Sequence, residues 1–161
     1  MKTLKMLPIL GCVLFLTTAS TCHNDDDDSS KHWDDNRNQS QNLIAQSMQQ
    51  GNWRITYYFD TDSDETSRFS SYTFSFGSDN VLTASNGSNT YTGSWSITDS
   101  HSSDDDNPHS DLDFNIAFSN PAAFAELTDD WDIVTQTASK IELIDISGGN
   151  GGTDHLIFEK N

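Results

Sequence analysis

Residues 51–59 read Gly-Asn-Trp-Arg-Ile-Thr-Tyr-Tyr-Phe, and the pattern in these residues is the main indicator of the fold. Within it, Trp53, Ile55, Tyr57 and Phe59 alternate with mostly polar neighbours. An apolar residue at every second position is typical of a β-strand that buries one of its faces. We therefore expect the first strand of the folded unit to begin just after Gly51, with these four side chains pointing inward.

The same period of two recurs along the rest of the chain. Alternation is strong in residues 72–76, 91–97 and 112–118, and weaker in residues 81–85, 131–137, 141–146 and 154–159. Turn-forming residues separate several of these segments, at 77–80, 86–87 and 147–152. The sequence therefore predicts eight strands with mostly short connections.

Two short helices accompany the strands. Leu43, Ile44 and Met48 predict an amphipathic helix over residues 42–50, which Gly51 ends. Asn120 can cap a second helix, between the fifth and sixth strands, whose first residue is Pro121. Because no crossover helices alternate with the strands, we expect antiparallel neighbours. The expected fold class is all-β, an eight-stranded antiparallel up-and-down meander closed into a barrel without free edges.

Gly51-Asn52-Trp53, at the head of the first strand and after a short helix, resembles the Gly-x-Trp motif of lipocalins. Together with the eight strands, the strand around residues 91–95 and the terminal Phe158-Glu159-Lys160, residues 51–160 look like the small lipocalin-like domains of Bacteroidota lipoproteins. The resemblance implies that Trp53 packs at the closed end of the barrel against a basic residue from near the last strand. The family's usual arginine is missing, and only Lys160 is placed for that role.

The N-terminus has the features of an export signal. Lys2 and Lys5 precede an apolar run over residues 6–16, which at about eleven residues is too short to span a bilayer. Residues 19–22, Ala-Ser-Thr-Cys, resemble a lipobox, in which Cys22 would receive acyl chains such as palmitate. The run Asp25, Asp26, Asp27 and Asp28 resembles the signal that sends Bacteroidota lipoproteins to the outer face of the outer membrane.

Cysteine usage favours this interpretation. Cys12 is removed with the leader, so that Cys22 is the only cysteine of the mature chain and no internal disulfide is possible. The expected organisation is a signal peptide over 1–21, a disordered acidic tether over 22–41 and a barrel domain over 42–161. The alternative is cleavage by general signal peptidase, which would use Thr17 and Ala19 and give a soluble secreted or periplasmic protein.

The chain is strongly acidic. Removal of Lys2 and Lys5 with the leader leaves six basic residues against 25 acidic ones, a net charge of −19. Such a chain repels phosphate backbones, which excludes nucleic acids as partners. It favours solubility, cationic partners and divalent ions. We expect a monomer that reaches the membrane only through its lipid.

Two acidic segments are candidate cation sites. Asp60, Asp62 and Asp64 match the opening of an EF-hand loop, but Glu65 stands where glycine is needed and Ser71 where the bidentate glutamate belongs. An EF-hand is thereby excluded, which leaves either weak calcium binding or a charged hairpin loop. Residues 99–111 hold two histidines and several aspartates that can ligate zinc or copper, in a spacing typical of a disordered loop. We expect the two segments at opposite ends of the barrel.

No catalytic motif is present in the sequence, so we expect neither enzymatic activity nor a cofactor. Eight strands are at the limit between a filled interior and a cavity for one small ligand. The first hypothesis is a carrier of a small apolar or amphipathic ligand. The second is an envelope-structural or protein-interaction module with a packed barrel. The candidate ligand-binding residues are Trp53, Tyr57, Tyr72, Tyr91 and Trp95.

Overall fold

The computed structural model describes residues 29–99, 112–147 and 152–161, with side chains from residue 38 onward. The helices are α1 (Ser29–Met48), the short 3-10 helix η1 (Thr66–Phe69) and α2 (Ala122–Ala125). The strands are β1 (Trp53–Asp60), β2 (Ser63–Asp64), β3 (Thr73–Phe76), β4 (Val81–Ser85), β5 (Thr90–Asp99), β6 (Leu112–Ala117), β7 (Asp129–Gln136), β8 (Lys140–Ile146) and β9 (Thr153–Lys160).

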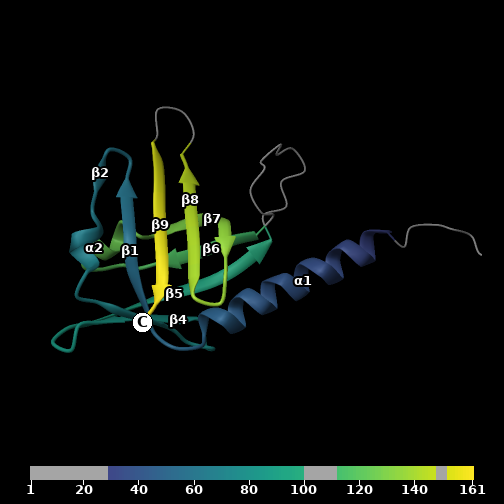
Figure 1. The fold of residues 1–161 in the computed structure, drawn as a ribbon, viewed down its shortest axis with the longest axis horizontal. Coiled ribbons are helices and arrows are strands. Elements are labelled where there is room, and N and C mark those ends of the chain that lie inside the picture. Colours follow the sequence, from purple (N-terminus) through teal and green to yellow (C-terminus); the bar gives the residue numbers. More distant parts are fainter. Residues whose placement is uncertain (1–28, 100–111, 148–151) are drawn as a thin grey trace, which may run out of the picture.

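The strands form a closed antiparallel barrel (Figure 1). Each strand from β3 to β9 pairs with the next in the chain, and β1 closes the ring by pairing with both β3 and β9. The two-residue strand β2 pairs with β1 as an extra strand. The expected all-β fold, an eight-stranded up-and-down barrel, is thereby confirmed. All eight predicted strands are present, and their bounds differ from the predicted ones by two residues or fewer at each end.

The two ends of the barrel differ, and we name each after its helix. At the α1 end lie the start of β1 and the turn over residues 77–80, and α1 packs there against β5. At the α2 end lie η1, α2 and the turn between β1 and β2. Residues 60–65 are therefore at the α2 end, whereas Asp99 and Leu112, which flank the second acidic segment, are at the α1 end. The expected separation of the two segments is confirmed for these flanking residues; residues 100–111 lie outside the described part.

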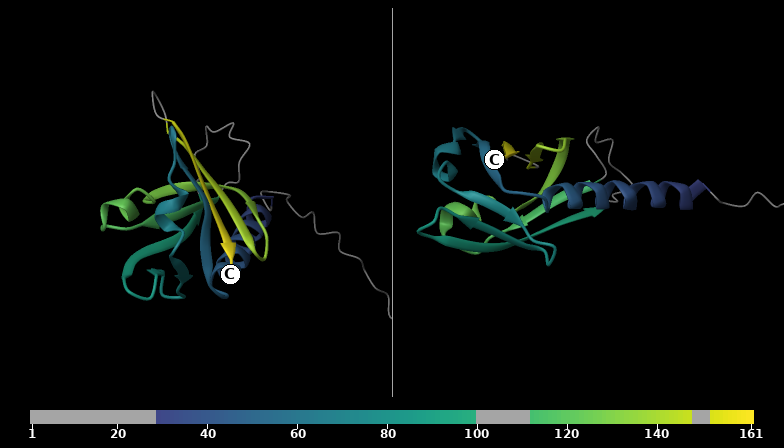
Figure 2. Two further views of the ribbon diagram at one scale, coloured as in Figure 1. Left: turned by 60° about the vertical axis from the view of Figure 1, so that its left-hand side comes forward. Right: turned by 60° about the horizontal axis from the view of Figure 1, so that its bottom comes forward.

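Helix α1 is longer than the sequence predicts. It begins at Ser29 rather than at residue 42, so residues 29–41, expected to be a disordered tether, are helical. Burial of Ile44 and Met48 and a hydrogen bond from Gln41 Nε2 to the Ile97 carbonyl hold its C-terminal part on the barrel. Once that part is formed, each further residue adds one hydrogen bond without a new nucleation cost. The remainder of α1 projects beyond the strands (Figure 2).

A β-bulge in β1 changes which side chains face inward. Ile55 pairs with Phe158, but Tyr57 pairs with Ile157, so Thr56 is an extra residue in the strand. Beyond the bulge the alternation is inverted: Tyr58 is buried, whereas Tyr57 is 36% exposed and Phe59 is half-buried. The expected inward orientation of Tyr57 and Phe59 is therefore wrong, because one inserted residue moves every later side chain to the opposite face.

Helix α2 is confirmed in position but not in its cap. Pro121 occupies the N-cap position rather than the first helical turn, and it makes no side-chain capping bond. Asn120 lies outside the helix. Among the described residues, no helix has the length and hydropathy that crossing a bilayer requires.

Candidate functional site

Aromatic rings fill the α2 end of the barrel interior around Phe124. Its ring lies 4.9–6.1 Å, between centroids, from the rings of Phe69, Tyr72, Phe74, Tyr91 and Phe118. Phe124 itself is 2% exposed. Because α2 lies at this end, the Phe124 ring occupies the barrel interior there.

Backbone and side-chain hydrogen bonds fasten the segment that carries Phe124. The Tyr58 hydroxyl donates to the Glu126 carbonyl at 2.9 Å, and Trp131 Nε1 donates to the Leu127 carbonyl at 3.1 Å. The backbone N–H of Phe118 donates to Thr128 Oγ1 at 2.9 Å. These bonds join the segment to β1, β7 and the end of β6, so α2 is fixed at the end of the barrel rather than being a free lid.

A second group of rings fills the α1 end. Phe76 lies at its centre, with centroid distances of 5.3–6.4 Å to Trp53, Trp95, Phe114 and Phe158. Phe158 also contacts Phe74 at 5.3 Å, which links this group to the rings around Phe124. The described interior is therefore one continuous network of aromatic contacts from end to end.

Trp53 closes the α1 end. Its Nε1 donates to the Met48 carbonyl at 2.8 Å, and its side chain is fully buried. Lys160 Nζ lies 4.9 Å from the centroid of the indole ring, within the range of a cation–π contact. The pairing of Trp53 with Lys160, which the lipocalin resemblance implies, is thus present in the structure.

The predicted ligand-binding residues are not gathered around one space. Trp53 and Trp95 are buried among the rings of the α1 end, and Trp95 Nε1 donates to the Gly77 carbonyl at 3.0 Å. Tyr72 and Tyr91 lie together at the α2 end, 5.9 Å apart, each against Phe124. Tyr57 lies on the outer face.

Several carboxylates lie at the α2 end of the barrel, at the ends of β1, β7, β8 and β9. Desolvation raises the pKa of Asp129 to about 6, and the carboxylates of Asp145 and Asp130 add to the shift. Burial is also the main cause of a raised pKa for the Tyr58 phenol, followed by the nearby charges of Asp60 and Asp154. The electrostatic potential at the α2 end is therefore negative, and the Asp129 carboxyl keeps its proton at mildly acidic pH.

The candidate calcium residues do not converge. Asp60 ends β1, while Asp62 is exposed in the turn and Asp64 accepts a hydrogen bond from the Thr66 N–H at 3.0 Å. In the ranges that the structure describes, no three acidic, histidine or cysteine side chains come together as metal ligands. Asp64 instead stabilises the start of η1. Hydrogen bonding with the Thr66 side chain, followed by the bond from the Thr66 N–H, lowers the pKa of the Asp64 carboxyl.

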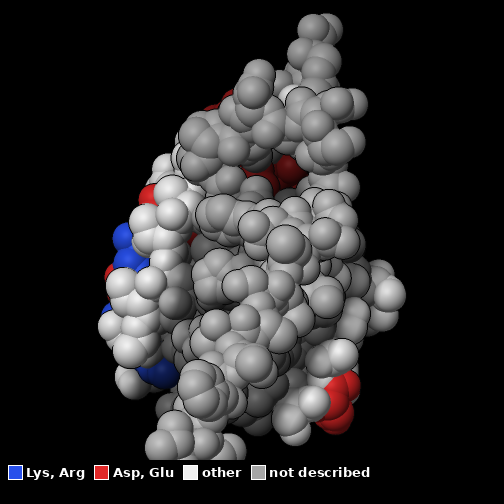
Figure 3. Space-filling model, turned by 90° about the vertical axis from the view of Figure 1, so that its right-hand side faces the viewer, with Lys and Arg blue, Asp and Glu red and all other residues white. Residues whose placement is uncertain are grey.

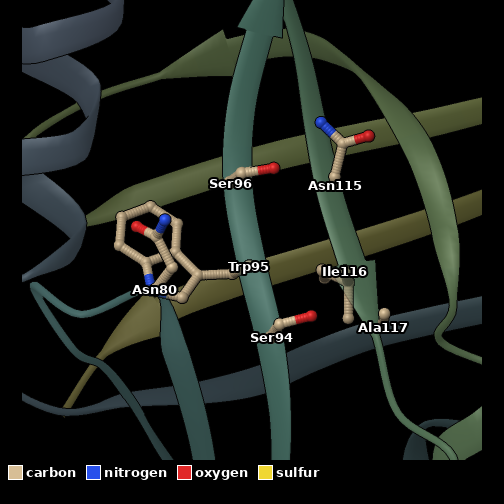
Figure 4. Close-up of a pocket in the computed structure, with 7 residues that line it drawn as sticks. All are labelled: Asn80, Ser94, Trp95, Ser96, Asn115, Ile116 and Ala117. Carbon is tan, nitrogen blue, oxygen red and sulfur yellow. The ribbon is translucent and has the colours of Figure 1, made fainter.

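A shallow depression of about 230 Å³ lies on the outer face of β5 and β6. Its walls are neutral. Figure 4 shows Ser94 and Ser96 pointing to one side of β5 and the Trp95 ring pointing to the other. Asn115 donates its side-chain amide to Thr98 Oγ1 at 2.8 Å. The depression is lined by the hydroxyls of Ser94 and Ser96 and by the amides of Asn80 and Asn115, and no ionised group is among its lining residues.

The bulge in β1 creates a feature that sequence reasoning missed. Its displaced aromatic residues join isoleucines of β8 and β9 on the outer wall, and we call this set the outer apolar face. Its members are Tyr57, Phe59, Ile144, Ile146 and Ile157. The only sequence signal is the adjacent pair Tyr57-Tyr58, which does not fit a strict alternation.

The lipidation residue Cys22 and the acidic run Asp25–Asp28 lie outside the described residues. The same holds for His101 and His109. No family model, no curated protein and no solved structure matches this chain.

Proposed function

We propose that this protein is a lipoprotein anchored through Cys22 to the outer membrane and facing the cell exterior, with a filled barrel that acts as a non-enzymatic protein-interaction module. The observation that supports this choice is the ring network around Phe124 and Phe76. Carriage of a small apolar ligand, the competing proposal, needs a space that these side chains occupy.

The anchor part of the proposal rests on residues 1–28, and the position and length of α1 are compatible with it. Helix α1 has 20 residues, and at 1.5 Å per residue it is about 30 Å long. An anchor at Cys22 would put this helix between the membrane and the barrel. The α2 end and the side walls would then be the surfaces that a partner can reach.

An apolar fluorescent probe tests the filled interior. We expect N-phenylnaphthylamine to show no saturable binding to the wild-type mature chain. Phe124→Ala serves as the positive control, because an apolar cavity left by its ring would stay dry and take up aromatic molecules. Saturable binding to the wild type, or a co-purified lipid in native mass spectrometry beyond the N-terminal acyl groups, would favour the carrier instead.

Membrane fractionation tests the anchor. Cys22→Ser should move the protein from the membrane to the soluble fraction, since a single residue carries all the acyl chains. Cys12→Ser is the matched control, because Cys12 belongs to the leader, and it should leave the protein in the membrane. Replacement of Asp25–Asp28 by asparagine should reduce labelling from outside the cell. A membrane-bound Cys22→Ser variant would overturn the anchor without affecting the barrel proposal.

A further inference from the structure

The outer apolar face is ordered by the strand register. One row across the sheet runs from Ile144 of β8 through His155 of β9 to Phe59 of β1. The next row runs from Glu142 of β8 through Ile157 of β9 to Tyr57 of β1. Paired residues of neighbouring strands point to the same side of a sheet, so these side chains share the outer wall.

The members of this face differ in exposure. Ile144 lies outside the core cluster, but neighbouring side chains cover most of it and it is only 9% exposed. Ile146, at the end of the same strand, is 56% exposed. The stacked rings of Tyr57 and Phe59 lie 6.4 Å apart. Tyr57 and Ile146 are thus two of the most exposed large apolar side chains in the described part of the chain.

Among the residues that the structure describes, α1 packs against β5 and α2 lies at the end of the barrel. Neither helix lies in front of β1, β9 and β8, which form the near face in Figure 1. Contiguous exposed apolar surface is unfavourable in water, and on soluble proteins it commonly marks an interaction site.

Acidic side chains border the outer apolar face. Asp132 pairs with Ile144 at one end of the first row, and Asp64 pairs with Phe59 at the other. The neighbouring basic side chains already have carboxylate partners, Lys140 with Glu142 at 2.9 Å and Arg54 with Glu159 at 3.8 Å. Figure 3 shows Lys and Arg side chains along one side of the described surface with carboxylates beside them.

The width of the face limits the form of a partner. Three neighbouring strands at about 4.8 Å spacing give a strip roughly 10 Å wide between the outer two. An α-helix with its side chains is about 10 Å across. Since β1, β8 and β9 each have a neighbour on both sides, a partner cannot extend the sheet there and must pack through its side chains.

We propose that the outer apolar face binds an amphipathic helix of another protein, with apolar residues on one side and Lys or Arg along the flanks. The proposal rests on the interaction-module function and names its partner class. Apolar side chains would cover Tyr57 and Ile146, while the cations would face Asp132 and Asp64. A second copy of this chain would bring like charges together, and an anionic membrane surface would be repelled by the same carboxylates.

A synthetic helix of about 18 residues, roughly five turns, with leucine on one face and lysine on the other, is a suitable probe. Fluorescence anisotropy with the mature chain should show saturable binding that weakens as salt rises. The same peptide with glutamate in place of lysine should not bind. The double variant Tyr57→Ser/Ile146→Ser should weaken binding about tenfold, as expected for truncation of central contact residues.

Matched variants separate a site from general charge attraction. Leu43→Ser removes another exposed apolar side chain, on α1, where Leu43 is 60% exposed, and should leave the affinity unchanged. Ile146→Lys at a well-exposed position should keep the fold, checked by circular dichroism, and should also weaken binding. Asp132→Asn should weaken binding more than Asp79→Asn, which changes a turn at the α1 end.

The possible failures are distinguishable. Equal affinities for wild type, Tyr57→Ser/Ile146→Ser and Ile146→Lys would overturn the face as the site, yet leave the interaction-module function standing. Absence of binding by the lysine peptide would overturn the partner class. Saturable uptake of N-phenylnaphthylamine by the wild type would instead count against the filled barrel on which the function rests.

Discussion

Phe124→Ala is the substitution from which we expect the largest change in stability. Phe124 is 2% exposed, and its ring contacts those of Tyr72 and Tyr91 at 5.0 and 4.9 Å. Phenylalanine-to-alanine changes in a core cost about 3–5 kcal/mol, from lost burial and from the cavity that remains. Since ring pairs contribute about 0.5–1.5 kcal/mol beyond burial, we expect about 4 kcal/mol.

Urea unfolding, followed by fluorescence of the buried tryptophans, measures this loss. The midpoint should fall with little change in the slope, because the surface exposed on unfolding is nearly the same. A domain of this size has a total stability of about 5–15 kcal/mol, so the variant should fold at low temperature. Its melting temperature should drop by about 15 °C, at roughly 4 °C per kcal/mol.

Phe59→Ala is the matched control, because it makes the same chemical change on the other side of the β1 bulge. Phe59 is half-buried on the outer wall, and we expect a loss of about 1 kcal/mol or less. Equal losses for the two variants, or a loss below about 1 kcal/mol for Phe124→Ala, would refute the conclusion that Phe124 is the plug of a filled interior.

Three further substitutions probe the charge and packing of the barrel. The pKa of Asp129 is about 6 in the folded chain, against 3.8 for a free aspartate. As pH rises, the unfolded chain therefore loses this proton before the folded chain does. The stability linked to the protonated carboxyl is fully present below about pH 4 and is lost as pH rises through 6. Asp129→Asn should therefore raise the unfolding free energy at pH 7.5 by about 1 kcal/mol, less than the ~3 kcal/mol of the full shift because water screens the partly exposed group; an equal gain at pH 3.5 in urea titrations would contradict this. Lys160→Met should lower stability by about 0.5–1 kcal/mol in the same assay, through loss of the contact with Trp53, and no change would show that packing alone holds the indole. Gly93→Ala would place its Cβ 2.3 Å from the Ala117 carbonyl oxygen and should cost about 1–3 kcal/mol by thermal melting, whereas the neighbouring Ser94→Ala should be close to neutral.

Period-two alternation was sufficient to predict all eight strands. Leu112, Phe114 and Ile116 of β6 are buried as expected, because a strand that covers a core must place every second side chain inside. The turn at residues 86–87 was also predictable from its residues, since Gly87 takes a positive φ of 83° between β4 and β5 and glycine adopts such a φ without steric cost.

The candidate site was predicted only in part. The contact between Trp53 and Lys160 was expected from the resemblance to lipocalins. Tyr72 and Tyr91 face inward as expected. The orientation of Tyr57 was not predictable, because a bulge depends on how β1 pairs with β9. The length of α1 was also missed, since its first residues have no apolar period to reveal a helix.

The fold class, the strand segments, the charge and the expected export signal follow from the amino-acid sequence, because each depends on local composition or on a short-range period. Which rings meet in the barrel interior and which residues form its outer wall became clear only from the folded structure. Both depend on contacts between segments far apart in the chain: Phe124 meets rings from β3 and β5, and the register of β1 against β9 turns Tyr57 outward. A one-residue shift in pairing reverses the side chains' faces, and no local pattern encodes it.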